Sequence, residues 1–419
     1  MTTSLTASRD VRDAPTPDVR RARVAVAALF FTNGGLFANL IPRYPEIKGD
    51  LALGNAAYGL AVAAFPTGAI LAGLAAGALI RRFGSGLIAV AGTLLTSLGV
   101  LAAGLSPTVV AFAAALLFGG AMDAITDVAQ NAHALRVQRL FGRSIINSFH
   151  AIWSIGAVTG GAMAAGALAI GLPRSIHLGL SALIFAAVSL VALRFCLPGP
   201  DGEDETADPV DAGLQAAAEE PEKRSRGNVS GRLLGVLAAL VLIATAGAIV
   251  EDAGNSWAAV YLSQSLGAPA ELAAWGFIAL VGAQFVGRLT GDRLVDRFGQ
   301  RAVARTGGVL VAAGLGLALA FPSVPGTIAG LAAAGLGVAT LVPAAMNEAD
   351  ELPGLRPGTG LTVVSWLMRL GFLLSPPIVG AIADAAGLRV GLLVVPAAGL
   401  AVATLAGVLS ARRSVPTGR

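Results

Sequence analysis

Apolar runs of about 20 residues recur along the whole chain, and they limit its fold more than any other feature. Each run is long enough to cross the hydrocarbon core of a bilayer as one helix. Of the 419 residues, 55% are hydrophobic and only 13% are charged, about half the charged share of a soluble domain. The 54 glycines suit membrane helices, because small residues let helix backbones approach closely. The chain is therefore predicted to be an all-α membrane protein.

The runs predict twelve membrane-spanning helices, six on each side of one long hydrophilic segment at residues 201–226. That segment begins acidic and ends basic, and it carries too little apolar surface to fold, so it is interpreted as a linker. A polar segment precedes the first span without a short apolar core and cleavage site, so no removable signal peptide is expected. The spans are predicted near 24–42, 56–80, 87–105, 107–131, 146–171, 175–197, 232–262, 271–291, 303–321, 324–346, 359–385 and 388–411. The predicted regions are a tail (1–23), a six-helix bundle (24–197), a linker (198–231), a second six-helix bundle (232–411) and a tail (412–419).

A basic turn occurs twice, after equivalent apolar runs. Arg82-Phe83-Gly84 and Arg297-Phe298-Gly299 lie 215 positions apart (297 minus 82), about half the chain. Gly156 in the fifth span and Gly371 in the eleventh share that offset. Internal repeats of this kind determine the architecture. The repeat predicts a duplicated six-helix unit, and carriers built from two such parallel units bind substrate near the bilayer midplane between them.

Arginine is distributed unequally between the two sets of loops, which predicts the orientation. The sparse set carries only Arg43, Lys48, Arg174 and Arg389. The rich set carries Arg20, Arg21, Arg23, Arg81, Arg82, Arg136, Arg139, Arg143, Arg224, Arg226, Arg293, Arg297, Arg301, Arg305, Arg412 and Arg413. Both termini and the linker are therefore expected in the cytoplasm, with the protein in the plasma membrane.

The basic turns resemble the cytoplasmic loop signature of the major facilitator superfamily, a Gly followed by Asp-Arg-x-Gly-x-Arg. Asp296, Arg297, Gly299 and Arg301 match it in the second half, whereas Arg81 stands where the first copy would carry its acidic residue. Phrases such as 31–35 (FTNGG) and 251–257 (EDAGNSW) more specifically resemble bacterial members near the fucose-permease branch. The resemblance implies two six-helix halves that transport a solute by alternating access. It also implies that every third helix is peripheral.

The turns supply the candidate gating residues. Asp296 can cap or pair at a helix terminus, while Arg297 and Arg301 can reach carboxylates on neighbouring helices. In the first half, Asp127 is expected to pair with Arg81 or Arg82. Such contacts would form only when the cytoplasmic side is closed. The alternative is that these arginines only follow the positive-inside rule.

Arg369 is the sharpest candidate for substrate binding. It lies about ten residues into the eleventh span, roughly 15 Å along the helix and so near the bilayer centre. A charge at that depth needs an anionic partner or substrate, and the alternative is a structural ion pair between helices. Ser365 and Trp366 lie one turn away. Two further candidates are Asn33 and Trp153, because indole faces beside amide groups suit a polar or sugar-like solute, although tryptophans also serve as interfacial anchors.

Ionisable side chains inside the spans supply the candidate proton-coupling residues. Asp123 on the fourth span could carry a proton or only form a helix–helix hydrogen bond. Glu251 and Asp252 on the seventh could load a proton from outside or belong to a solvated outer gate. His150 on the fifth titrates near physiological pH when unperturbed, but a lone histidine near a helix start is more often structural.

The same sequence argues against other function classes. The single cysteine and three scattered histidines match no metal template, and no phosphate-binding loop of the nucleotide-driven pumps is present. We expect neither enzyme activity, cofactor, metal nor nucleic-acid binding, and a monomer in the bilayer. The favoured function is proton-coupled symport of a small polar, sugar-like solute. The main alternative is a proton-antiport exporter of drugs or metabolites, which would be expected to show more Phe and Met around its cavity; a channel or a nontransporting receptor is less favoured.

Overall fold

The computed structural model describes residues 16–199, 231–356 and 358–411, and every regular element in them is a helix. The first half contains α1 (Pro17–Ala38), η1 (Ile41–Arg43), α2 (Tyr44–Asp50), α3 (Asn55–Val62), α4 (Ala64–Gly73), α5 (Ala76–Phe83), α6 (Ser85–Gly104), α7 (Val109–Phe141), α8 (Ile146–Ala169) and α9 (Arg174–Leu193). The second half contains α11 (Gly231–Val260), η2 (Tyr261–Ser265), α12 (Ala270–Phe298), α13 (Gln300–Ala320), α14 (Val324–Val338), α15 (Leu341–Asp350), α16 (Thr359–Ala386), α17 (Leu388–Gly391), α18 (Val394–Leu405) and η3 (Ala406–Val408).

Twelve stretches of the described chain are long and apolar enough to cross a membrane. This confirms the all-α class and the predicted number of spans. Several spans consist of two or three consecutive helices, as in α3–α4 and α14–α15. The fourth and eighth spans extend beyond their predicted ends, to Phe141 and Phe298, because polar residues continue the helix after the apolar run. The predicted linker and both predicted tails lie mostly outside the described residues.

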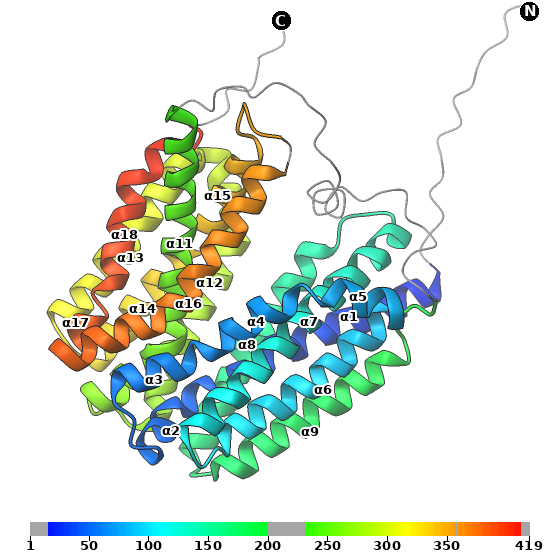
Figure 1. Cartoon of the computed structure of the whole chain (residues 1–419), viewed down its shortest axis with the longest axis horizontal. Helices are drawn as coiled ribbons and strands as arrows, with labels where there is room; N and C mark the ends of the chain where they lie inside the picture. Colours follow the sequence, from blue (N-terminus) through cyan, green and yellow to red (C-terminus); the bar gives the residue numbers. More distant parts are fainter. Residues whose placement is uncertain (1–15, 200–230, 357, 412–419) are drawn as a thin grey trace, which may run out of the picture.

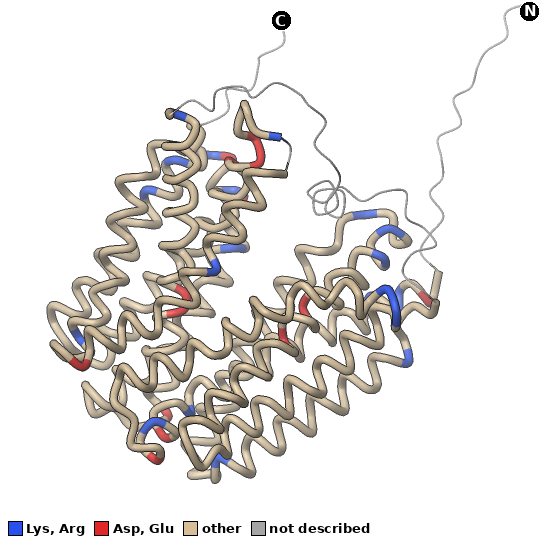
Figure 2. The backbone as a smooth tube through the Cα atoms, viewed as in Figure 1, with Lys and Arg blue, Asp and Glu red and all other residues tan. Residues whose placement is uncertain are grey.

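The two halves form separate bundles that meet at one end and diverge at the other (Figure 1). We call the end at which α1 and α11 begin the open end. The closed end is where α2, α3, η2 and α17 lie. Contacts between halves run mainly from α3 to α16 and from α8 to α12. Basic residues, all of them arginines among the described residues, gather at the open end, where α5 and α12 finish (Figure 2).

Glycine contacts repeat at the offset that the sequence predicts. A Cβ atom on Gly120 would collide with the backbone carbonyl of Phe65, which joins α7 to α4. In the second half, a Cβ atom on Gly335 would collide with the carbonyl of Leu280, which joins α14 to α12. Both members of each pair are shifted by 215 residues (335 minus 120 and 280 minus 65). The structure therefore has the same helix crossing in both halves.

The two basic turns also share one backbone conformation. Gly84 ends α5 with φ 83° and Gly299 ends α12 with φ 84°. A positive φ favours glycine, which has no Cβ atom to clash. Arg82 lies over the ring of Phe83, and Arg297 lies over the ring of Phe298, at 5.2 and 5.3 Å from the ring centroids. The repeated Arg-Phe-Gly sequence thus forms the same helix-ending turn in both halves.

The closed end is sealed by polar contacts between the halves. The carboxylate of Asp384 on α16 accepts hydrogen bonds from the backbone N–H groups of Asn55 (2.8 Å) and Ala56 (2.9 Å) at the start of α3. These N–H groups have no partner within their own helix. The Tyr58 hydroxyl donates to the backbone carbonyl of Ser256 on α11 at 2.7 Å. A carboxylate of the second half therefore caps the N-terminus of a helix in the first half.

Aromatic packing closes the same end further. Trp257 is fully buried, and its ring stands edge-on to that of Tyr58 with centroids 4.9 Å apart. Beside them, the Lys48 ammonium donates to the Gln264 side-chain oxygen at 2.9 Å. Trp257 is thus a packing residue of the closed end.

Candidate functional site

A cavity of about 390 Å³ lies between the two halves. Its lining comes from both bundles and combines polar, aromatic and small side chains. The lining residues are Asn33, Gly34, Phe37, Ala38, Ile41, Tyr44, Val62, Phe65, Pro66, Ala69, Ile70, Asp123, Trp153, Ala157, Glu251, Asp252, Asn255, Ser256, Phe277, Val281, Gln284, Met368, Arg369 and Phe372. None comes from α6, α9, α13 or α18, so the third, sixth, ninth and twelfth spans are peripheral to it, as expected.

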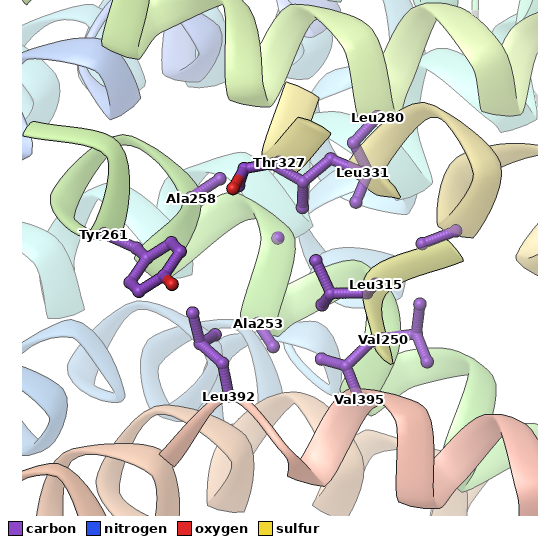
Figure 3. Close-up of a pocket in the computed structure, with 12 residues that line it drawn as sticks. Val250, Ala253, Ala258, Tyr261, Leu280, Leu315, Thr327, Leu331, Leu392 and Val395 are labelled. Carbon is purple, nitrogen blue, oxygen red and sulfur yellow. The ribbon is translucent and has the colours of Figure 1, made fainter. Parts of the chain in front are cut away.

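A second cavity lies inside the second half and has a different character (Figure 3). It measures about 10 Å³ and is lined by side chains such as Val250, Leu315 and Val395, with Tyr261 and Thr327 at its edge. That volume is at the lower limit for one water molecule. Because it lies within one bundle, it is a packing void rather than part of a path between the halves.

Three residues of the first half form one hydrogen-bonded cluster in the main cavity. The side-chain amide of Asn33 on α1 donates to Asp123 on α7 at 2.9 Å. The indole N–H of Trp153 on α8 donates to the amide oxygen of Asn33 at 2.7 Å. Gln130 adds a longer contact to the same oxygen at 3.4 Å. The structure thus brings together Asn33, Trp153 and Asp123, which were selected separately from the sequence.

Glu251 and Asp252 of the second half have different surroundings although they are adjacent. The Glu251 carboxylate accepts from the Gln284 amide at 2.8 Å and lies 3.8 Å from the Arg288 guanidinium. Asp252 is 8% exposed and accepts from the Ser256 hydroxyl at 3.4 Å; its second oxygen is buried without a hydrogen bond, and the Ser375 side chain interacts with the same carboxyl. Glu251 is therefore a compensated charge, whereas Asp252 is an under-satisfied acid on the cavity wall.

Arg369 on α16 lines the cavity and is exposed to it. Its guanidinium extends toward Gly73 on α4 of the first half, 3.9 Å from where a Cβ atom would stand there. No acidic oxygen within the described part of the chain lies within 4.0 Å of it. A cation within the membrane span that lacks a protein anion is suited to bind an anionic or strongly polar group of a ligand.

Asp127 and His150 lie toward the open end and are exposed there. Asp127 accepts from the side chains of Gln130 (3.4 Å) and Asn131 (3.1 Å), and it interacts electrostatically with His150 and Arg369. His150 stands edge-on to the ring of Phe30. The expected pairing of Asp127 with an arginine of the first basic turn is not formed in this conformation.

Ser365 and Trp366 do not line the cavity. Trp366 lies three positions before Arg369, so the two side chains project about 60° apart around the helix axis, and only Arg369 reaches the cavity lining. Trp366 is 54% exposed, and Leu370 and Leu374 on nearby positions are also exposed. Their predicted contact with substrate is therefore not retained in the proposals below.

The gating candidates of the second half make no ion pair with the first half within the described residues. The Arg301 guanidinium donates to the carbonyl of Leu409 at 3.0 Å, and its backbone N–H donates to Ser410. Asp296 and Arg297 are exposed, as are Arg81 and Arg82. These residues lie at the diverged open end, so their gating role stays a prediction.

Several lining residues escaped sequence reasoning. Gln284 holds Glu251, and four phenylalanines together with Met368 form much of the apolar wall: Phe37, Phe65, Phe277 and Phe372. Single apolar residues in an apolar span give no signal of which face they occupy. Gln284 could have been found as a lone amide within the eighth span.

Comparison with known proteins gives the family. A model of the Major Facilitator Superfamily matches residues 26–293 and 241–419. The chain belongs to the major facilitator superfamily. The membrane protein MosC of Rhizobium meliloti is 30% identical over 387 residues, covering 92% of this chain and 90% of that protein. The predicted membrane transporter is thereby confirmed, whereas the finer likeness to the fucose-permease branch stays a prediction.

Solved structures share the fold at low identity. The nucleoside transporter NupG superposes with a TM-score of 0.68 at 12% identity, covering 94% of this chain and 98% of that chain. A D-xylose-proton symporter superposes with a TM-score of 0.67 at 17% identity, covering 91% and 96%. At these identities the likeness establishes the fold alone.

Proposed function

We propose that this transporter imports a small polar solute together with protons by alternating access. The observation that carries the proposal is the cavity between the halves, which holds under-compensated carboxyls from both bundles and an arginine with no acidic oxygen of the described residues within 4.0 Å. Charged groups inside a membrane protein are costly and mark substrate or ion pathways. A site at the interface between two repeats is the arrangement that alternating access requires.

The arginine-rich loops support a cytoplasmic position for the open end under the positive-inside rule. The conformation described above is then inward-open, with the outer gate shut by the α3 and α16 contacts. In the outward-open state the cytoplasmic ends of the halves would approach each other. Asp296 and Arg297 would then meet partners that are out of reach in the inward-open state.

Asp252 is the preferred proton-carrying residue. It lies on the cavity wall, is almost completely buried, and has one oxygen with no partner. Asp123 is the second candidate, since its hydrogen-bond partner among the described residues is the neutral amide of Asn33. Glu251 is less suited because Gln284 and Arg288 hold its charge. His150 does not line the cavity, and it could carry a proton only at the open end.

Arg369, Asn33 and Trp153 are the proposed substrate contacts. The indole and the phenylalanines offer faces for a ring, while the amides and the guanidinium offer hydrogen bonds at its edge. The nucleoside transporter and the xylose symporter with the same fold carry ring-containing polar solutes, as their names state. That agreement supports, at the level of solute class, a sugar-like or nucleoside-like substrate.

A second candidate, a proton-antiport exporter, is favoured by one observation. The expected scarcity of Phe and Met around the cavity is not found, because four phenylalanines and Met368 line it. The apolar wall would suit an apolar metabolite or drug. Import is still the preferred proposal, because both carboxyl clusters and Arg369 line the same cavity between the halves.

The direct test reconstitutes the full chain in proteoliposomes with a pH-sensitive dye inside. Sugars, polyols, nucleosides and organic acids are added in turn, and solute-dependent proton entry is recorded with and without an imposed pH gradient. Import by symport predicts that an accepted solute moves protons in the same direction as itself. Proton release on solute entry would instead establish antiport.

Asp252→Asn should abolish proton movement while exchange of labelled solute across the membrane (counterflow) persists, because the binding cavity is retained. The matched control is Glu271→Gln, a carboxyl-to-amide change in the first turn of α12 and outside the cavity lining. If Asp252→Asn retains proton movement and Asp123→Asn loses it, Asp123 is the proton-coupling residue instead. Retention in both variants would contradict carboxyl coupling at this site.

A further inference from the structure

A groove of about 650 Å³ runs along the outside of the first half, between α1 and α9. Its walls are apolar: Val24, Ala25, Ala28, Ala187, Val188, Val191, Ala192 and Phe195. Its only charged lining residues, Arg20 and Arg21, stand at one end. This groove is separate from the cavity between the halves and shares no lining residue with it.

The groove is open to its surroundings. Val24 is 70% exposed, Val191 is 56% exposed and Phe195 is 47% exposed. Since α1 and α9 span the membrane in this fold, surface that no helix covers faces lipid. A row of uncovered valines beside small alanines therefore forms a trough for a flexible apolar chain. From Arg20 to Ala28 the trough extends about 12 Å along α1.

The charged end lies where a lipid headgroup would be. Arg20 and Arg21 are in the first turns of α1, at the open end, and the C-terminal end of α9 lies at the same level with exposed Arg194. Asp18 offsets part of the Arg21 charge at 3.3 Å. Arg20 makes no ion pair with any described residue. Two guanidinium groups above an apolar trough match an anionic head above acyl chains.

We propose that this groove is a binding site for an anionic phospholipid. The arginines hold the phosphate, and the trough between α1 and α9 holds an acyl chain. The repeat supplies an internal contrast, because the positions 215 residues after Arg20 and Arg21 are Gly235 and Val236. The second half therefore has no charged residue at these two positions, although Arg232 lies one turn earlier on α11.

The test uses native mass spectrometry of the full-length protein after delipidation in detergent, titrated with phosphatidylglycerol or with zwitterionic phosphatidylcholine of the same chains. The wild-type chain should bind phosphatidylglycerol preferentially. Each basic residue near an anionic surface contributes about fivefold in affinity, so Arg20→Ala with Arg21→Ala should weaken it roughly 30-fold. The matched control removes two exposed arginines at the open end of the other half, Arg293→Ala with Arg305→Ala, and should leave this affinity unchanged.

The apolar trough is tested separately with Val191→Trp, which fills it and leaves both arginines in place. This variant should lose phosphatidylglycerol binding as the double arginine variant does. A photo-cross-linking residue at Val24 should yield an adduct of lipid mass in membranes that contain phosphatidylglycerol. A cross-link to residues 1–15 or 200–230 of the chain would assign the groove to the protein itself and overturn the proposal. Equal weakening by the control pair would overturn it too.

Discussion

Arg369 and the carboxyls of the central cavity differ in how the protein holds them. Glu251 has an amide and a guanidinium within reach, and Asp123 has the amide of Asn33. Arg369 has no acidic oxygen within 4.0 Å among the described residues, because Asp127, with which it interacts electrostatically, lies farther away, and its side chain is exposed. The structural ion pair that the sequence left open as an alternative is therefore absent in this conformation. The residue is free to meet a ligand.

Arg369→Ala should weaken solute binding by about tenfold to a hundredfold, since a hydrogen bond to a charged group contributes about 1.5–3 kcal/mol. Arg369→Lys should recover only part of the loss, because an ammonium lacks the planar fork of a guanidinium. Binding is measured by counterflow in proteoliposomes, with thermal stability in detergent as the control. Unchanged counterflow in a well-folded Ala variant would exclude a direct substrate role.

Sequence reasoning located the polar side chains of the cavity better than its apolar wall. Asn33, Asp123 and Arg369 stand out because polar groups are rare in the spans, and all three line the cavity. Trp366 does not line the cavity in this conformation, and depth along a span cannot reveal which face of the helix a residue occupies. The phenylalanines could not be found because apolar residues face lipid, core and cavity alike.

At the scale of the helix, glycines set the crossing distances. A Cβ atom on Gly156 of α8 would collide with the backbone carbonyl of Phe31 on α1. The equivalent Gly371 on α16 meets Thr245 and Ala248 on α11, with nearest atoms 2.8 Å from its added Cβ. Side chains at these positions would force the paired helices apart. The common offset of Gly156 and Gly371, visible in the sequence, thus has a structural basis.

Gly156→Ala should destabilise the folded protein by about 1–3 kcal/mol, the typical cost of overpacking. Gly166→Ala in the same helix is the matched control, because nothing lies within 4 Å of its added Cβ. The control should be neutral or slightly stabilising, since alanine favours helix over glycine. Melting followed by size-exclusion chromatography in detergent measures both. Equal melting temperatures would show that α1 and α8 tolerate a wider crossing.

At the scale of the whole molecule, the two ends of the transporter are in opposite states. At the closed end Asp384 caps α3 across the interface, while at the open end Asp296 meets no such partner within the described residues. The number of spans and the duplication could be predicted because they follow from hydropathy and from repeated residue patterns. Which end is closed could not be predicted, because the same sequence must support both the inward-open and the outward-open conformation.

Asp384→Ala removes the cap from α3 and should shift the protein several-fold toward the outward-open state. Asp296→Asn removes a proposed cytoplasmic contact and should shift it the other way, slowing turnover while binding persists. Labelling of Val62→Cys in a Cys196→Ser background by an impermeant maleimide, added from outside, reports the shift. Labelling should rise in the first variant and fall in the second. A change in the same direction for both would contradict opposed gates.

Ser256 links Asp252, the proposed proton site, to the closed end. Its hydroxyl donates to Asp252, and its backbone carbonyl accepts from Tyr58 of the other half. If opening the outer gate moves Ser256, the affinity of Asp252 for its proton changes with it. Thermodynamic linkage makes that effect reciprocal, so proton binding must shift the gate equilibrium by the same free energy. One serine would then let the external pH set the fraction of transporters that face outward.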